Sequence, residues 1–164
     1  MKRFLTFFLL LIIPIFIWSQ KYVSYTYKPL AAEGCTVGFT ALQQDTVKYI
    51  IVRIQSDRLQ FSPHPILMLK TYEDEVIKLS GLALNSSSES TGIMIGNMMI
   101  PITEISALAQ FPINNEQIEK LNKGITKVRI STVPLIHERV FKKDKIGKKL
   151  YKQFQKLNDF NSDF

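Results

Sequence analysis

The chain has 164 residues, of which 46% are hydrophobic and 21% are charged. This length and balance indicate one globular domain and exclude a disordered or fibrous protein. The formal net charge of +7 favours anionic partners, and it falls to +5 without Lys2 and Arg3 at the N-terminus. No aromatic-rich basic strand or recognition helix accompanies this charge, so we expect no nucleic-acid partner.

Residues 1–20 have the organisation of a secretory signal peptide. Lys2 and Arg3 precede an apolar run from Phe4 to Trp18, and polar residues begin at Ser19. The run is shorter than the roughly 20 apolar residues that a membrane-spanning helix needs. We therefore predict cleavage and export to the periplasm or cell envelope, with a retained N-terminal membrane anchor as the alternative. The body, residues 21–164, is predicted to be a single domain.

Cys35 is the only cysteine, so an exported form of this chain cannot contain an internal disulfide. Its stability must then come from a hydrophobic core. A body of about 144 residues buries roughly two-thirds of its unfolded surface, which suffices without covalent links. We expect Cys35 to be a small buried side chain, and the alternatives are a disulfide between two chains or a reactive thiol.

The first half of the body has the pattern of β-strands. Alternation of apolar and polar residues predicts strands over residues 21–28, 35–42, 47–54, 66–72 and 76–84. The second and third of these form a predicted hairpin. The acidic segment Glu73–Glu75 joins the last two and is expected to be an exposed turn.

The second half combines strands with two helices. The predicted elements are a surface loop at 85–92, strands over 93–100 and 102–109, a helix over 116–122, a strand over 125–132 and a C-terminal helix with a frayed tail at 158–164. Asn114 or Asn115 is the expected cap of the short helix. The succession predicts an α+β fold, with a mostly antiparallel β-sheet of about six to eight strands, as a sandwich or a roll, covered by the two helices.

The C-terminal helix is amphipathic. Ile146, Leu150, Phe154 and Leu157 recur at spacings of four, four and three, so they share one side of the helix. Asp144 is the expected cap, because its negative charge suits the positive end of a helix. Five lysines occupy the opposite side: Lys145, Lys148, Lys149, Lys152 and Lys156. They are candidates for contact with an anionic membrane or glycan surface, and a solvated face is the alternative.

Residues able to carry chemistry form no recognisable catalytic or metal-binding motif. His64 and His137 lie in predicted loops without a nucleophile motif, and together with Cys35 they lack the spacing of zinc ligands. Glu73–Glu75 is expected to be a solvent-exposed turn, which does not give two carboxyls the contrasting surroundings that general acid–base catalysis requires. Four methionines are predicted to be core side chains rather than copper ligands: Met68, Met94, Met98 and Met99. We predict no catalytic residue, no metal and no cofactor.

Two segments, Ile66–Leu79 and Gln110–Ile130, resemble small secreted proteins of Bacteroidota-type bacteria whose activity is unknown. In these proteins a strand that ends in an acidic turn is followed by a short helix, a glycine and a strand that carries an arginine. The resemblance implies a periplasmic or cell-envelope location and supplies no catalytic residue. The expected function is a non-catalytic binding or interaction module that contacts an envelope protein or an anionic surface. A peripheral membrane-surface protein is the second hypothesis, and a hydrolase is the third.

Overall fold

The computed structural model describes residues 23–27, 35–95 and 98–162 of the chain. The predicted signal peptide and its cleavage site lie outside these residues. The described part contains eleven strands, β1 to β11, and two helices, α2 and α3. Every strand pair is antiparallel, so the α+β class predicted from the sequence is confirmed.

The first sheet has five strands in the order β1-β2-β3-β8-β7. They are β1 (Val23–Tyr27), β2 (Cys35–Gln44), β3 (Val47–Ser56), β7 (Leu82–Ile95) and β8 (Met98–Ile113). Side chains of a strand alternate between its two faces, and Ile50, Val52 and Ile54 of β3 all point inward and are fully buried. The predicted hairpin of β2 and β3 is confirmed, and it turns at Asp45 and Thr46.

The second sheet has four strands in the order β11-β9-β5-β6. They are β5 (Ile66–Thr71), β6 (Val76–Ser80), β9 (Ile125–Ile130) and β11 (His137–Val140). Two short strands, β4 (Gln60–Phe61) and β10 (Thr132–Val133), form a separate pair. The sequence predicts none of β4, β10 and β11 as a separate strand, which is one reason why the structure exceeds the six to eight strands expected.

The chain passes from the second sheet to the first at Gly81, between β6 and β7. A Cβ atom at residue 81 would lie 2.5 Å from the carbonyl oxygen of Gln110 and 2.5 Å from the ring of Phe111 on β8. Only glycine permits this close approach, so the chain can change direction here and pass from one sheet to the other. We call this point the Gly81 corner. The sequence predicts one strand over 76–84, and that prediction is wrong at Gly81, where the strand changes sheets.

Buried side chains from both sheets and both helices form one hydrophobic cluster. Phe39 and Phe111 enter it from the first sheet, and Leu67 and Ile130 enter it from the second, all with no exposed surface. The two sheets therefore share a core. This core lies between the Gly81 corner on one side and the edge strands β1 and β11 on the other.

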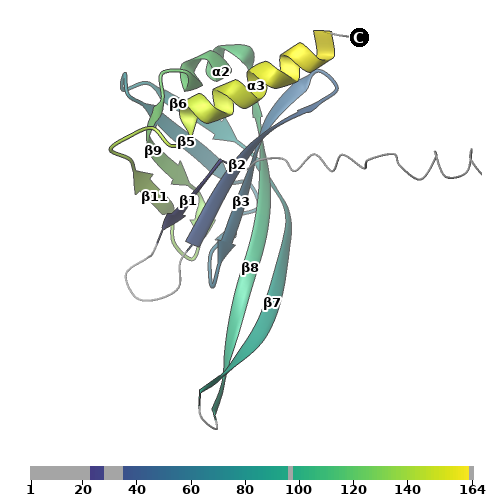
Figure 1. Cartoon of the computed structure of the whole chain (residues 1–164), viewed down its shortest axis with the longest axis vertical. Helices are drawn as coiled ribbons and strands as arrows, with labels where there is room; N and C mark the ends of the chain where they lie inside the picture. Colours follow the sequence, from purple (N-terminus) through teal and green to yellow (C-terminus); the bar gives the residue numbers. More distant parts are fainter. Residues whose placement is uncertain (1–22, 28–34, 96–97, 163–164) are drawn as a thin grey trace, which may run out of the picture.

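Helix α2 (Asn115–Leu121) begins with a capping box. The Asn114 side chain accepts a hydrogen bond from the Gln117 backbone amide at 2.8 Å, and the Gln117 side chain accepts one from the Asn114 amide at 3.1 Å. Helix α3 (Gly147–Ser162) continues through most of the segment predicted to be a tail. Both helices lie at one end of the molecule (Figure 1), where α3 packs against α2 and β2.

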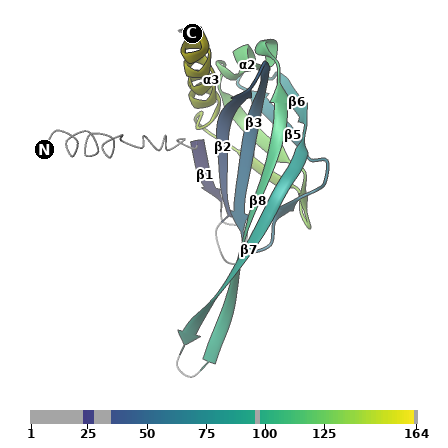
Figure 2. The same cartoon turned by 90° about the vertical axis from the view of Figure 1, so that its right-hand side faces the viewer.

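Strands β7 and β8 form a hairpin that extends far beyond the rest of the first sheet (Figure 1). Pairing of β8 with β3 ends at Ile105, so the residues beyond it pair only within the hairpin. We call this part, residues 89–95 with 98–104, the arm. At about 3.3 Å per residue, each strand of the arm is roughly 23 Å long. The arm ends at the opposite end of the molecule from α2 and α3 (Figure 2).

The arm corrects two predictions. Residues 85–92, predicted to be a surface loop, are part of β7, and the predicted strands 93–100 and 102–109 are replaced by the end of β7 and by β8. A strand that does not pack on a core can be polar throughout. The serine-rich composition of residues 85–92 therefore does not indicate that they form a strand. Pro101 is tolerated inside β8 because β8 has no second neighbour within the arm.

Candidate functional site: a lysine surface at helix α3

Asp144 fixes the start of helix α3. Its carboxylate accepts hydrogen bonds from the backbone amides of Ile146, Gly147 and Lys148 at 3.1, 2.8 and 2.9 Å. It also accepts one at 3.0 Å from the amide of Ile125, the first residue of β9. Burial raises the pKa of this carboxyl, but the four amide hydrogen bonds outweigh burial, so the pKa is lowered. The predicted cap is confirmed, and it also ties the helix to the second sheet.

The apolar side of α3 is occupied by the core of the protein itself. Ile146, Leu150 and Phe154 are fully buried, and Leu157 is half-buried against the same cluster. On an adjacent side of the helix, the side-chain oxygen of Gln153 accepts a hydrogen bond at 3.1 Å from a backbone amide of β2. The predicted packing of this helix on the strands is confirmed, so its apolar side cannot bind another molecule without unfolding.

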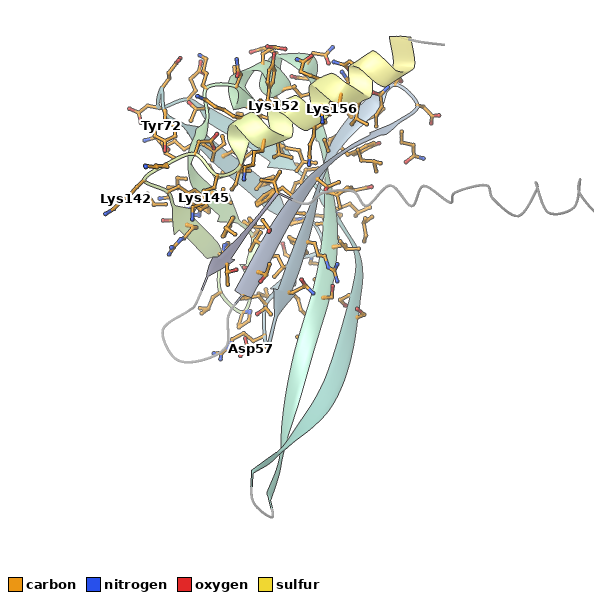
Figure 3. All side chains as sticks on the ribbon, viewed as in Figure 1. Asp57, Tyr72, Lys142, Lys145, Lys152 and Lys156 are labelled. Atoms are coloured by element: carbon orange, nitrogen blue, oxygen red, sulfur yellow. The ribbon has the colours of Figure 1, made fainter. Side chains whose placement is uncertain are left out.

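The opposite side of α3 is basic. All five lysines predicted there are exposed, four of them on α3 and Lys145 in the loop before it, and Lys142 and Lys143 are exposed in the same loop. We call these seven residues the lysine surface: Lys142, Lys143, Lys145, Lys148, Lys149, Lys152 and Lys156. Figure 3 shows Lys152 and Lys156 along the helix and Lys142 and Lys145 beside the loop before it. Sequence reasoning missed Lys142 and Lys143 because they precede the helical period, although they adjoin Lys145 in the sequence.

No lysine of this surface forms an ion pair with another residue that the structure describes. Elsewhere in the part of the chain that the structure describes, four of six lysines form ion pairs with nearby carboxylates, and Lys48 and Lys78 do not. The pairs are Lys70 with Asp74 at 2.7 Å, Lys120 with Glu116 at 2.9 Å, Lys123 with Glu73 at 2.6 Å and Lys127 with Glu138 at 2.7 Å. Charges of one sign gathered on one surface create a potential that attracts ions of the opposite sign. The lysine surface is therefore suited to contact an anionic partner.

The acidic turn between β5 and β6 is part of the scaffold. Lys123, just after α2, lies 2.6 Å from a carboxylate oxygen of Glu73 and 3.0 Å from one of Glu75. Inside the turn, the Thr71 hydroxyl accepts hydrogen bonds from the amides of both glutamates at 3.2 Å. These contacts fix the turn against the segment that follows α2, and they give its carboxylates a structural role.

His137 lies in β11, whereas the sequence places it in a loop. Its side chain is 3% exposed, and its Nε2 is 2.8 Å from the hydroxyl of Tyr25 on β1. Burial, together with the charge of Arg139, lowers the pKa of His137 to about 4. Burial likewise raises the pKa of Tyr25. Both rings are therefore uncharged and form a structural pair, while His64 is exposed between β4 and β5.

Cys35 is fully buried at the start of β2, as predicted. Burial, with a smaller contribution from the negative charge of Asp57, raises the pKa of its thiol to about 11. A thiol reacts as the thiolate, so Cys35 is unreactive at neutral pH, and its burial prevents pairing with another chain. Among the residues that the structure describes, no group of three His, Cys, Asp or Glu side chains is placed to hold a metal ion.

No family model matches the chain, and neither the curated proteins nor the solved structures show a significant similarity to it. Over residues 23–27, 35–95 and 98–162, no helix is both long enough and apolar enough to cross a membrane. The lysine surface and the fold that presents it are therefore the observations from which we infer a function.

Proposed function

We propose that the chain is an exported binding module of the cell envelope, without chemistry of its own, that contacts an anionic partner through the lysine surface. The observation that carries this proposal is the set of seven exposed lysines that no described carboxylate neutralises. The apolar leader at residues 4–18 and the resemblance to small secreted bacterial proteins support the envelope location.

The partner that we favour is an acidic surface of another envelope protein. Helix α3 has 16 residues and is therefore about 24 Å long, which is comparable with one side of a protein–protein interface. The lysine side chains are long and their charged groups are in water, so they can adapt to carboxylates at varied positions. A contact of this kind is driven by charge, and it weakens as salt is added.

The second candidate is peripheral attachment to an anionic membrane. Each basic residue near such a surface contributes about 1 kcal/mol, so the lysine surface is sufficient for reversible attachment. Helix α3 cannot insert, because its apolar residues Ile146, Leu150 and Phe154 are inside the protein core. The third hypothesis, a hydrolase, gains no support, because His137 is held neutral and Cys35 is held protonated inside the fold.

Charge reversal on α3 tests the proposal. Lys148, Lys149, Lys152 and Lys156 are all changed to Glu in one variant and to Arg in a matched control. Retention on immobilised poly-glutamate and co-sedimentation with phosphatidylglycerol-rich vesicles are measured for both variants and the natural chain. Pure phosphatidylcholine vesicles report any attachment by other segments, and circular dichroism verifies the fold.

Retention on poly-glutamate that is lost in the Glu variant and kept in the Arg variant supports a protein partner. Binding that is restricted to the phosphatidylglycerol-rich vesicles, with the same dependence on the variants, supports the membrane candidate instead. Equal behaviour of the natural chain and the Glu variant in both measurements contradicts the proposal, because the lysine surface would then bind nothing anionic.

A further inference from the structure

The loop between β10 and β11 exposes four consecutive apolar residues. Val133, Leu135 and Ile136 are 50%, 65% and 55% exposed, and Pro134 among them is exposed as well. Leu135 is the most exposed large apolar side chain in the part of the chain that the structure describes. A run of this kind on a protein surface indicates that it contacts something apolar. We call residues 133–136 the apolar loop.

The apolar loop is held in shape by contacts within the protein. Val133 belongs to the pair that β10 forms with β4. The hydroxyl of Thr132 donates a hydrogen bond to the carbonyl of Leu135 and accepts one from the amide of His137 at 3.0 Å. Pro134 has no amide hydrogen that needs a partner. The loop is therefore preorganised, and these internal contacts reduce the cost of moving its backbone out of water.

The outer face of the second sheet carries four cations. Residues that alternate with buried ones along β5, β6 and β9 point away from the core. The outward cations are Lys70, Lys78, Lys127 and Arg129. The side chains of Lys70 and Arg129 are 43% and 50% exposed, so no element that the structure describes covers this face. Two carboxylates pair with these cations, Asp74 with Lys70 and Glu138 with Lys127, so positive charge is in excess.

The strand register places the apolar loop beside these cations. Arg129 on β9 is directly opposite Glu138 on β11. His137, the neighbour of Glu138, points into the core, so Ile136 and Glu138 on either side of it point outward. Val140, two residues further along β11, is 63% exposed and adds an apolar side chain to the same face. We call the four cations, Val140 and the apolar loop together the docking face.

We propose that the docking face attaches the protein to the surface of an anionic lipid bilayer, with Leu135 and Ile136 inserted between the headgroups. Apolar side chains bound in this way lie about 5–10 Å deep, at the boundary of headgroups and acyl chains. The cations of β5, β6 and β9 then contact the lipid phosphates. Helix α3 takes no part, so the lysine surface stays available for an acidic partner, and the inference does not depend on what that partner is.

A bilayer fits the docking face better than a second copy or another protein does. Two copies placed face to face would bring their cations together, and like charges repel. The exposed parts of the apolar loop and Val140 also supply well under the area of about 800 Å² that each partner buries in a stable complex. A protein partner would need an apolar pocket beside carboxylates, whereas an anionic bilayer always has hydrocarbon directly beneath its phosphates.

A fluorescent label in the apolar loop tests the insertion. Leu135→Cys carrying a nitrobenzoxadiazole label is compared with labelled Thr46→Cys, an exposed position in the turn between β2 and β3. Cys35 is buried and takes no label. Vesicles of phosphatidylglycerol and phosphatidylcholine in equal parts are added. We expect the emission at residue 135 to rise at least about twofold, because the label leaves water. Nitroxide groups on the acyl chains should quench it, and the label at residue 46 should show neither effect.

A second substitution in the labelled Leu135→Cys chain tests the apolar contribution. Ile136→Gln removes one of the two inserted side chains. It should lower the emission change at a sub-saturating lipid concentration at least about threefold. Val47→Gln is the matched control, because Val47 is an exposed apolar residue on β3, outside the docking face. It should leave the emission change as it is.

Charge reversal in the same labelled chain tests the cations. Lys78→Glu should lower the emission change with the anionic vesicles at least about fivefold, and it should have no effect with pure phosphatidylcholine vesicles. Lys156→Glu is the matched control, because it reverses one charge of the lysine surface on α3. We expect the control to retain the emission change of the labelled chain.

Several results would overturn the proposal. They include a label at residue 135 that does not respond to vesicles, and equal responses at residues 135 and 46. Equal losses from Lys78→Glu and Lys156→Glu would assign the attachment to the lysine surface instead. An emission rise without lipid that grows with protein concentration would assign the apolar loop to contact with a second copy. The two labelled chains alone decide the first two results, so the proposal remains testable even if a charge variant fails to fold.

Discussion

The hydroxyl of Tyr25 and the Nε2 of His137 are 2.8 Å apart, and both side chains are buried. Tyr25 is in β1 at the edge of the first sheet, and His137 is in β11 at the edge of the second. Their rings are stacked with centroids 5.8 Å apart, and Phe141 packs edge-on against Tyr25 at 5.0 Å. The pair therefore joins the two sheets on the side opposite the Gly81 corner.

Tyr25→Phe should destabilise the protein by about 1–3 kcal/mol, because it removes the hydroxyl partner of a buried nitrogen and leaves the ring in place. Urea unfolding followed by circular dichroism measures the change. Tyr151→Phe is the matched control, since that hydroxyl donates to Glu119 at 3.1 Å on the exposed surface. We expect the control to change the free energy of unfolding by less than about 0.5 kcal/mol. Equal effects of the two substitutions would contradict the structural role of the Tyr25–His137 pair.

The burial of His137 makes stability depend on pH. Burial, and then the charge of Arg139, lower its pKa from 6.5 to about 4. Between these values the unfolded chain binds a proton that the folded chain does not, so the free energy of unfolding rises with pH. This contribution is complete above about pH 6.5, and up to about 3 kcal/mol is lost as pH falls toward 4. Urea unfolding at pH 5 and pH 7.5 should show the difference, and an imidazole NMR signal of His137 that titrates near 6.5 would contradict it.

The C-terminal helix and its lysine side are predictable from the sequence because their determinants are local. The spacing of Ile146, Leu150 and Phe154, and the cap at Asp144, act within a few helical turns. Any fold that contains this helix must bury one side and expose the other. Lys142 and Lys143 join the lysine surface only through the path of the loop, which no helical period encodes.

The arm and the Tyr25–His137 pair are not predictable in the same way, because both depend on contacts between distant residues. The polar run 85–92 becomes a strand only by pairing with β8. His137 becomes buried only when β11 pairs with β9 and β1 covers its ring. The local composition of residues 85–92 and of the segment around His137 favours loops, because the first is polar and the second follows Pro134.

Gly81→Ala should destabilise the protein by at least about 3 kcal/mol, because the added methyl group would press on the backbone and ring of β8 residues that cannot move away. Soluble yield and thermal unfolding measure the effect. Ser80→Ala is the neighbouring control, since Ser80 is exposed, and it should shift stability by less than about 0.5 kcal/mol. An unchanged melting temperature in the Gly81→Ala variant would show that β8 leaves room for a side chain at residue 81.

Asp144→Ala should cost about 3 kcal/mol, because four backbone amides, those of Ile125, Ile146, Gly147 and Lys148, lose their acceptor together. Asp144→Asn keeps one acceptor oxygen and should cost about 1 kcal/mol. Asn114→Ala, which removes the cap of α2 alone, is the control and should also cost about 1 kcal/mol. Urea unfolding should therefore give Asp144→Ala a clearly lower free energy of unfolding than either of the other two variants. Equal losses would mean that the carboxylate caps α3 without tying it to β9, and that the position of the lysine surface depends on the buried side of the helix alone.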